Sequence, residues 1–195
     1  MFVILASQSP RRLQLLQAAG FTVDVRPSHI DESPQQGENA ASMTLRLCRE
    51  KALACVLTDA DVCPVIAADT LVCLGDEALG QPKDLEDAQA MLEKLSGRAH
   101  QVHTAVCVRL AHVCRVEMVT TLVHFRPISA AEIDTYLLHN DILDKAGSYA
   151  IQGGASGFIT AIEGALDNVI GLPVLHTRQL IQQVQTQLRQ DKEKV

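Results

Sequence analysis

The chain has 195 residues, of which 47% are hydrophobic and 21% charged, and its formal net charge is −6. A chain of this length and composition suits one globular domain, or one domain with two lobes. The net negative charge argues against broad, non-specific binding to nucleic acid, which requires a basic face. It leaves room for a small anionic ligand, because a few local Lys and Arg side chains are able to bind a phosphate within an acidic protein.

The cysteines and the N-terminal segment both indicate a cytoplasmic protein. None of the six cysteines belongs to a C-x-x-C pair, so we interpret them as buried free thiols rather than as disulfides or zinc ligands. The apolar run at 2–6 is too short for the core of a signal peptide, and it precedes the first arginines instead of following them. No stretch approaches the roughly 20 apolar residues of a membrane span. We therefore expect a soluble cytoplasmic protein that binds neither membranes nor nucleic acid.

The first half of the chain alternates strands and helices. Ser9 followed by Pro10 is typical of a helix start, and Gly20 is typical of a helix stop. Apolar side chains at helical spacing indicate a second, long amphipathic helix after residue 39. The elements expected in this half are a strand over 2–6, a helix over 10–19, a strand over 22–26, a polar loop over 27–39, a helix over 40–57, strands over 65–68 and 71–74, and a turn at 75–76.

The second half continues the alternation and completes an α/β protein with a mixed sheet. Asp84 and Asp87 indicate a helix start, and Ser129 with Glu132 has the pattern of a capping box. The elements expected here are a helix over 84–97, strands over 101–110 and 115–125 joined by a hairpin turn at 111–112, a helix over 129–138, a flexible turn at 153–157, a strand over 158–162, and a helix after Pro173. We predict one domain over 1–190, and a frayed, charged tail over 191–195.

The segment from Ser7 to Arg12 is the first candidate site. A strand that leads into a capped helix presents free backbone N–H groups, which form an anion site. Arg11 and Arg12 are unfavourable for the dipole of that helix, and a bound anion would offset this cost. The alternative is a pair of solvated arginines on an ordinary capped helix. The segment lacks the pattern of a Walker loop.

Asp69 is the second candidate, because it follows four apolar residues at the expected end of a strand. Catalytic groups of α/β sheets commonly lie at such strand ends. The carboxylate is therefore a candidate metal ligand, or a base that removes a proton from water. The alternative is an ordinary aspartate in a turn.

Three lysines and one glutamine complete the set of candidates. Lys51 lies on the predicted long helix, and Lys83 follows Pro82. Lys145 and Gln152 lie in a segment rich in small residues, where Gln152 offers an amide that is able to contact a base. Each lysine alone is more typical of a solvated surface, and the segment around Gln152 is alternatively a plain glycine-containing connection. The histidines show no metal-ligand spacing, and no serine, histidine and acid set suggests a hydrolase triad.

These segments together resemble the Maf family of nucleotide pyrophosphatases over nearly the whole chain. Each motif is weak alone, and their order along the chain carries the resemblance. The motifs are Leu5-Ala-Ser7-x-Ser9-Pro-Arg-Arg12, Glu50-Lys51-Ala52, Ala68-Asp69-Thr70, Leu95-Ser-Gly97 with His100-x-Val-x-Thr104, Asp144-Lys-Ala-Gly-x-Tyr-x-Ile-Gln152-Gly, and Asn168-Val-Ile-Gly171-Leu-Pro173. The resemblance implies an α/β fold related to inosine triphosphate pyrophosphatases, with an elongated mixed sheet flanked by helices and a central cleft between two lobes.

The resemblance also implies an activity and a cofactor. The implied reaction is the hydrolysis of a nucleoside triphosphate, dTTP or UTP, to the monophosphate and pyrophosphate. Asp69 is implied as the catalytic carboxylate, and a divalent cation, Mg²⁺ or Mn²⁺, would be held by Asp69 with Glu32. Four further residues are implied to bind the substrate: Ser7, Arg12, Lys51 and Lys83.

The choice of base is implied to depend on Arg11, Thr70 and Gln152. The subfamily resembling dTTP/UTP pyrophosphatases carries Arg, Thr and Gln at these positions, as this chain does. The subfamily that acts on 7-methyl-GTP carries Trp, Gln and Glu at the matching places.

One position departs from the family pattern. The family usually has a lysine directly before the proline of its Lys-Pro-x-Asp motif, where this chain has Gln81, and Lys83 is the candidate substitute. Two alternatives therefore stay open: a pyrophosphatase for 7-methyl-GTP or modified nucleotides, and a nucleotide-binding regulator, for instance of cell division, with weak catalysis. Gln81 favours the regulator, and Asp69 argues against it. A homodimer is one option for the assembly.

Overall fold

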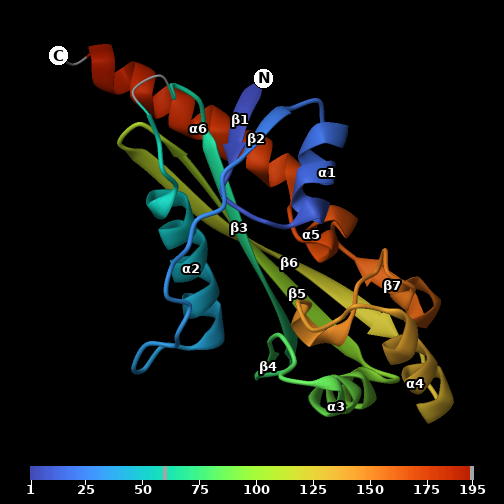
Figure 1. The fold of residues 1–195 in the computed structure, drawn as a ribbon. Helices are drawn as coiled ribbons and strands as arrows, with labels where there is room; N and C mark the ends of the chain where they lie inside the picture. The colour runs from blue at the N-terminus through green and yellow to red at the C-terminus, as the bar shows by residue number, and fades with distance from the viewer. Residues whose placement is uncertain (59–60, 194–195) are drawn as a thin grey trace. The chain divides into compact units, whose positions relative to one another are not determined.

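The computed structural model describes residues 1–58 and 61–193 (Figure 1). Its helices and strands, in chain order, are β1 (Phe2–Leu5), α1 (Pro10–Ala18), β2 (Thr22–Val25), α2 (Ala40–Ala54), β3 (Val65–Leu74), β4 (Glu77–Leu79), α3 (Leu85–Leu95), β5 (Ala99–Leu110), β6 (Val113–Phe125), α4 (Ala130–His139), the 3₁₀ turns η1 (Ala146–Ser148) and η2 (Ala155–Phe158), β7 (Ile159–Glu163), α5 (Leu166–Ile170) and α6 (Val174–Glu193).

The strands form a seven-stranded mixed sheet in the order β2-β1-β3-β5-β6-β7, with β4 paired to β3. Strand β1 pairs in parallel with both β2 and β3, whereas β4 and β7 run antiparallel to their neighbours. The predicted α/β class with a mixed sheet flanked by helices is confirmed.

The chain divides into two compact units. Unit 1 contains Met1–Asp69, Thr104–Val119 and Gly171–Val195, and unit 2 contains Thr70–His103 and Thr120–Ile170. Strands β3, β5 and β6 contribute residues to both units. The boundary on β3 falls between Asp69 and Thr70, two of the residues that the sequence singles out.

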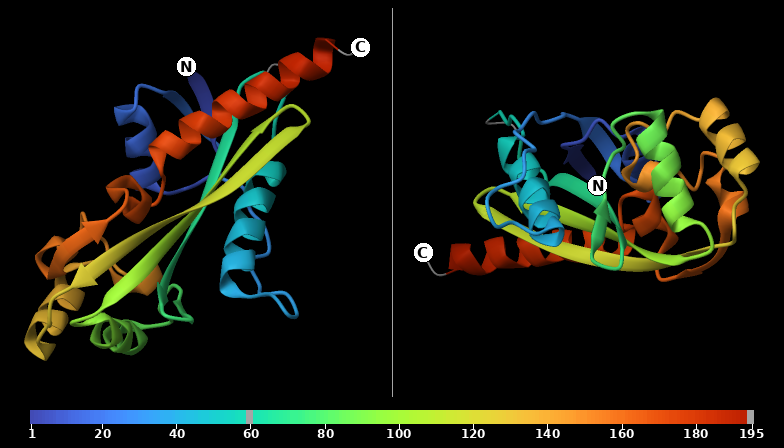
Figure 2. Two further views of the ribbon diagram at one scale, coloured as in Figure 1. Left: turned by 180° about the vertical axis from the view of Figure 1, so that it is seen from behind. Right: turned by 90° about the horizontal axis from the view of Figure 1, so that it is seen from below.

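Helices cover both faces of the strands in unit 1. Leu5 of β1 belongs to a core cluster with Leu16 of α1 and Ile181 of α6. Its neighbour Ile4 belongs to a second cluster with Cys48 of α2. Since successive side chains of a strand point to opposite faces, α1 and α6 cover one face and α2 covers the other, as Figure 2 shows for α2 and α6. Strands buried on both faces explain the continuous apolar runs in the sequence.

The core of unit 2 is built around a buried histidine among aromatic rings. His100 is 1% exposed, and its ring meets those of Phe125 and Tyr149 edge-on, with centroids 4.8 and 5.4 Å apart. Its Nε2 lies 2.8 Å from the hydroxyl of Tyr149. Burial lowers the pKa of His100 to about 4, because the charged imidazolium loses its hydration there. His100 is therefore a neutral core residue.

His100 makes the stability of the protein depend on pH. Its pKa is about 6.5 when unfolded and about 4 when folded, so the unfolded chain takes up the proton first as the pH falls. The contribution is intact above pH 6.5, and up to about 3 kcal/mol is lost as the pH falls to about 4. In urea unfolding at pH 8 and pH 4.5, His100→Gln should lose less stability between the two pH values than the parent. His139→Gln, at an exposed histidine, serves as the control, and equal losses in all three proteins would contradict the assignment.

Several element boundaries differ from those predicted. Helix α2 ends at Ala54 and not at 57, because the backbone of Cys55 is extended. The side chain of Arg109 donates hydrogen bonds to the carbonyl oxygens of Ala52 and Leu53 at this helix end. Strand β4 and the short helix α5 were not predicted. Helix α6 continues to Glu193, so residues 191–193 of the predicted tail are helical, and 194–195 lie outside the described residues.

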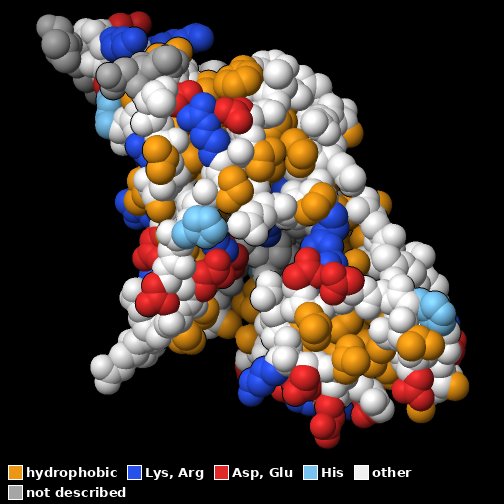
Figure 3. Space-filling model, viewed as in Figure 1, with side chains coloured by type: hydrophobic (Ala, Val, Ile, Leu, Met, Phe, Trp, Pro, Cys, Tyr) orange, Lys and Arg blue, Asp and Glu red, His pale blue; other side chains and the backbone are white. Residues whose placement is uncertain are grey.

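Other local predictions are confirmed. Ser9 and Asp84 cap α1 and α3, and Ser129 and Glu132 form the capping box of α4. All six cysteines are free, although only half of them are buried. Within the described residues, none of the helices combines the length and the hydropathy that a membrane crossing needs. On the face drawn in Figure 3, Lys and Arg side chains lie beside Asp and Glu side chains instead of forming one basic surface.

Candidate active site

Asp69 lies within strand β3 and not at its end, so that part of the prediction is wrong. The strand continues from Val65 to Leu74, where its last residues pair with β4. The signal that resembled a strand end is a change in burial: residues 65–68 are fully buried, whereas Asp69 is partly exposed. Ala67 belongs to the core cluster under α2, and Asp69 is two residues further on, so its carboxylate points to the same face.

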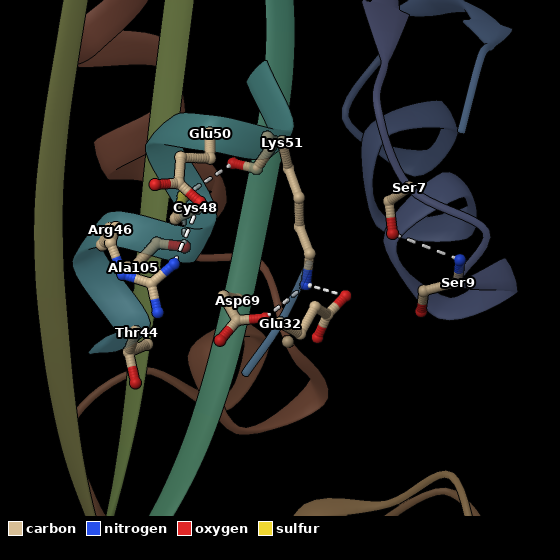
Figure 4. Close-up of polar contacts among 12 residues, drawn as sticks. Ser7, Ser9, Glu32, Thr44, Arg46, Cys48, Glu50, Lys51, Asp69 and Ala105 are labelled. Atoms are coloured by element: carbon tan, nitrogen blue, oxygen red, sulfur yellow. Dashed lines mark hydrogen bonds and ion pairs between the residues drawn. The ribbon is translucent and has the colours of Figure 1, made fainter. Parts of the chain in front are cut away.

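The Lys51 ammonium joins two carboxylates at this place. Its Nζ lies 2.8 Å from Oδ1 of Asp69 and 3.0 Å from Oε1 of Glu32 (Figure 4). The Lys51 side chain is only 13% exposed, compared with 19% for Asp69 and 58% for Glu32. Three residues that are distant in the sequence, from α2, β3 and the loop at 27–39, therefore meet in unit 1 with a net charge of −1.

The position of Lys51 follows from how α2 packs on the sheet. Cys48, one helical turn earlier, donates its thiol proton to carbonyl oxygens of Ala67 and Ala105 at 3.4 and 3.3 Å. Burial raises the pKa of the Cys48 thiol, so it remains a neutral donor. Residues three apart share one face of a helix, so this contact directs Lys51 toward β3 and Asp69.

Arg46 holds the loop that carries Glu32 against α2. Its guanidinium makes a bidentate ion pair with Glu38, at 2.7 and 2.8 Å, and donates to the carbonyl oxygen of Ser33 at 3.1 Å. A third contact, 3.0 Å to Glu50, stays within α2. The hydrogen bonds from Arg46 lower the pKa of Glu38, so the pair stays charged. Arg46 was not predicted as a site residue, since its i, i+4 spacing to Glu50 is the only one of these contacts that the sequence shows.

The opening segment is bound to the residues between α5 and α6. Nε of Arg12 donates to the carbonyl oxygen of Gly171 at 2.9 Å, and Nη1 donates to Oγ of Ser7 at 3.0 Å. Ser7 also accepts from the backbone N–H of Ser9 at 3.2 Å. Burial lowers the pKa of Arg12, and the negative charge of Asp69 opposes that shift. Arg12 therefore holds Ser7 and Gly171 together through hydrogen bonds, and its charge interacts electrostatically with Asp69.

The remaining candidates belong to unit 2. Thr70 follows Asp69 on β3 and points to the opposite face of the strand. Lys83 is exposed directly before α3, and its backbone N–H donates to Asp87 at 3.0 Å. Gln152 is exposed between the turns η1 and η2. The roles predicted for Thr70, Lys83 and Gln152, and for Arg11 in the first turn of α1, stay predictions.

Gln81 is bound to the segment that precedes Gln152. Its Nε2 donates to the carbonyl oxygen of Asp144 at 3.3 Å, and Gly80 accepts from the backbone N–H of Gly147 at 3.0 Å. Gly147 has a φ of 68°, and a Cβ there would come within 3.0 Å of the Val72 side chain. Glycine is therefore required at this position, and the amide of Gln81 serves a structural contact within unit 2.

The carboxylates of Asp69 and Glu32 suit a divalent cation that also has phosphate ligands. Within residues 1–58 and 61–193, no group of three or more His, Cys, Asp or Glu side chains is arranged to hold a metal ion. Mg²⁺ is commonly bound through one or two carboxylates together with water and substrate phosphates. Asp69 and Glu32, which share the Lys51 ammonium, fit that kind of site and not an all-protein cage.

The contacts by which Arg46 holds the loop at 27–39 against α2 can be tested without an activity assay. Arg46→Ala should release Glu38, whose carboxylate also accepts from the backbone N–H of Gln35 at 3.2 Å. We expect amides of the loop at 31–38 to exchange with solvent about tenfold faster, as measured by hydrogen exchange. Arg26→Ala is the matched control, because it removes an equally bidentate pair, with Asp61, from the same unit. An unchanged exchange rate in Arg46→Ala would show that other contacts order the loop.

Comparison with known proteins assigns the family. The model of the family described as Maf-like protein matches residues 2–184. The chain belongs to the Maf family, as its motifs predicted.

Curated relatives span almost the whole chain. A protein of Anaeromyxobacter sp. (strain Fw109-5), named dTTP/UTP pyrophosphatase, is 47% identical over 184 residues, which cover 92% of this chain and 87% of that protein. A protein of Shewanella oneidensis with the same name is 43% identical over 188 residues, covering 93% and 97%. Among solved structures, the Staphylococcus aureus Ham1 protein has a TM-score of 0.42 and 13% identity, over 64% of this chain and 72% of its own.

Proposed function

We propose that this protein is a nucleoside triphosphate pyrophosphatase that hydrolyses dTTP and UTP to the nucleoside monophosphate and pyrophosphate. Relatives that are 42–47% identical over at least 92% of the chain carry the name dTTP/UTP pyrophosphatase. The observation that carries the proposal for the chemistry is the contact of the Lys51 ammonium with Asp69 and Glu32. This contact supports the proposal, because a carboxylate, an ammonium group and a second carboxylate lie together there.

Asp69 is the proposed base for the attacking water. Lys51 contacts Oδ1 at 2.8 Å, and a carboxylate is a group that accepts a proton from water. A carboxylate has lone pairs on both oxygens, so it is able to bind Lys51 and a water together. The ion pair also fixes the orientation of the carboxylate, which matters because proton transfer requires hydrogen-bond distance to the water.

Lys51 is the proposed link between the base and the phosphates. An ammonium group has three donors, and two of them are directed at Asp69 and Glu32. The third is able to bind a phosphate oxygen of the substrate. Arg12 adds a positive charge in the same unit. We also assign a substrate-binding role to Ser7 and Lys83. Cations placed against the phosphates stabilise the charge that develops on the leaving pyrophosphate.

Asp69 and Glu32 are the proposed protein ligands of a divalent cation, Mg²⁺ or Mn²⁺. When bound, the cation would offset phosphate charge and polarise the phosphoryl group. Arg46 supports this role, because its contacts with Glu38 and Ser33 hold the loop in which Glu32 lies.

We propose further that Arg11, Thr70 and Gln152 choose the base. The amide of Gln152 has an acceptor and two donors, so it is able to pair with the O4 and N3–H edge that thymine and uracil share. Cytosine presents an amine and a bare N3 at that edge. A polar group left unpaired in the wrong complex costs about 1–3 kcal/mol, which is enough to discriminate between bases.

The proposal extends to the surroundings of the enzyme. Free cysteines are typical of a reducing compartment, which supports a cytoplasmic location. The intermingled charges on the face in Figure 3 support a small-molecule substrate over nucleic acid. A homodimer is the assembly to test against a monomer by sedimentation.

A panel of triphosphates tests the function. Release of pyrophosphate should be fastest with dTTP and UTP, and slower with CTP, ATP, GTP and 7-methyl-GTP. It should require Mg²⁺ or Mn²⁺ and stop with EDTA. A preference for a purine would refute the base assignment, and binding of dTTP without turnover would favour a nucleotide-binding regulator. The regulator function is supported by Gln81, which stands where the family usually has a lysine.

The role of Asp69 is tested by Asp69→Asn. An amide accepts no proton from water and binds a divalent cation poorly, so turnover of dTTP should fall by about 10²-fold or more. Asp24→Asn is the control, since Asp24 is another carboxylate of unit 1 in an ion pair, with Arg26. Both variants should remain folded by circular dichroism. Turnover near the parent rate in Asp69→Asn would leave Asp69 with a structural role only.

A further inference from the structure

Two cysteines lie in contact outside the candidate active site. Cys107 is on β5 and Cys114 is on β6, and a two-residue turn joins these neighbouring strands. Their sulfur atoms are 3.3 Å apart. A disulfide bond has a sulfur–sulfur distance of about 2.05 Å, so the two atoms need to approach by little more than about 1 Å. Both residues belong to unit 1, which means that the contact lies within one compact body.

The two thiols have different surroundings. Cys107 is buried in the cluster under α2, where the hydrogen bond with Cys114 and burial raise its pKa. Cys114 is partly exposed. The hydrogen bond with Cys107 lowers the pKa of Cys114, burial opposes this shift, and three positively charged side chains add to it: Arg49, Arg109 and Arg115. A partly exposed thiol in positive surroundings, beside a second thiol, is the arrangement of redox-reactive cysteines.

We propose that Cys107 and Cys114 form a peroxide-reactive dithiol that closes to a disulfide. The Cys114 thiolate attacks one oxygen of hydrogen peroxide, the O–O bond breaks, and hydroxide leaves and becomes water, which converts Cys114 to a sulfenic acid. The Cys107 sulfur then attacks the Cys114 sulfur, and the hydroxyl leaves with the thiol proton as a second water. Two thiols are oxidised and one peroxide is reduced to two waters. This proposal is independent of the proposed pyrophosphatase activity.

The other cysteines lack this combination. Cys63 and Cys73 are partly exposed, but burial raises the pKa of both thiols. Cys48 donates to two backbone carbonyl oxygens, and its pKa is raised. Cys55 is buried, with a raised pKa. Oxidation is therefore expected first at the pair of Cys107 and Cys114.

Thiol counting and peptide mass spectrometry test the proposal on the full chain. After treatment with hydrogen peroxide at pH 7, the parent should lose two of its six thiols, and a peptide linked through Cys107 and Cys114 should weigh about 2 Da less than the reduced pair. An ordinary thiol is only a few per cent ionised at that pH, so the parent should react about tenfold faster than Cys114→Ser. Cys63→Ser, which removes a comparably exposed thiol, should react like the parent and is the matched control.

Several outcomes would overturn the proposal. Retention of all six thiols under these conditions is one. A disulfide that joins two chains on a non-reducing gel is another, as is a sulfenic acid that forms on Cys63 as fast as on Cys114. Because the decisive mass is measured on the parent protein, a folding defect in a serine variant does not affect the result. The dithiol can be refuted whether or not the protein hydrolyses dTTP.

Discussion

The contact of the Lys51 ammonium with Asp69 is the interaction on which the rest of the site depends. It joins the last turn of α2 to the position where β3 leaves the core of unit 1. A largely buried ion pair gains little net stability, because desolvation of both charges offsets their attraction. The pair is therefore better explained by the chemistry that it makes available than by the stability of the fold.

Several layers of structure keep this pair in place. The sheet supplies the direction of Asp69, because the alternation of β3 turns its side chain to the face that α2 covers. The thiol of Cys48 fixes α2 on the carbonyl oxygens of β3 and β5. Arg46 then brings the polar loop to the same helix, so that Glu32 reaches the ammonium from the solvent side. An arrangement of this kind leaves the acidic pair partly open to a ligand while its supports are shielded.

The face of the sheet under α2 carries an ion pair and a pair of thiols in contact. Lys51 directs its charge toward Asp69, whereas Arg49, two residues earlier on α2, acts electrostatically on Cys107 and Cys114. Residues two apart on a helix do not share a face, so these two cations extend from different sides of α2. One helix thus carries a cation that pairs with a carboxylate and a second cation whose charge acts on the two thiols.

The sequence by itself determined most of the elements, the caps of α1, α3 and α4, and the family. These features depend on residues within a few positions of one another: Ser9 and Pro10 at one helix start, Ser129 and Glu132 at another, and apolar runs of strand length. Local hydrogen bonds and side-chain periodicity encode them without reference to the rest of the chain. The motifs are equally local, which is why their order identified the Maf family.

Only the tertiary structure decided which of the singled-out residues touch. Asp69 follows an apolar run and so resembled a strand end, but pairing with β4 extends β3 beyond it. Lys51 is separated from Asp69 and Glu32 by segments whose paths depend on packing. Contacts across such segments are set by how α2 and the strands bury their apolar faces together. No periodicity in the sequence records that, because the distance between two side chains in space is not fixed by their separation along the chain.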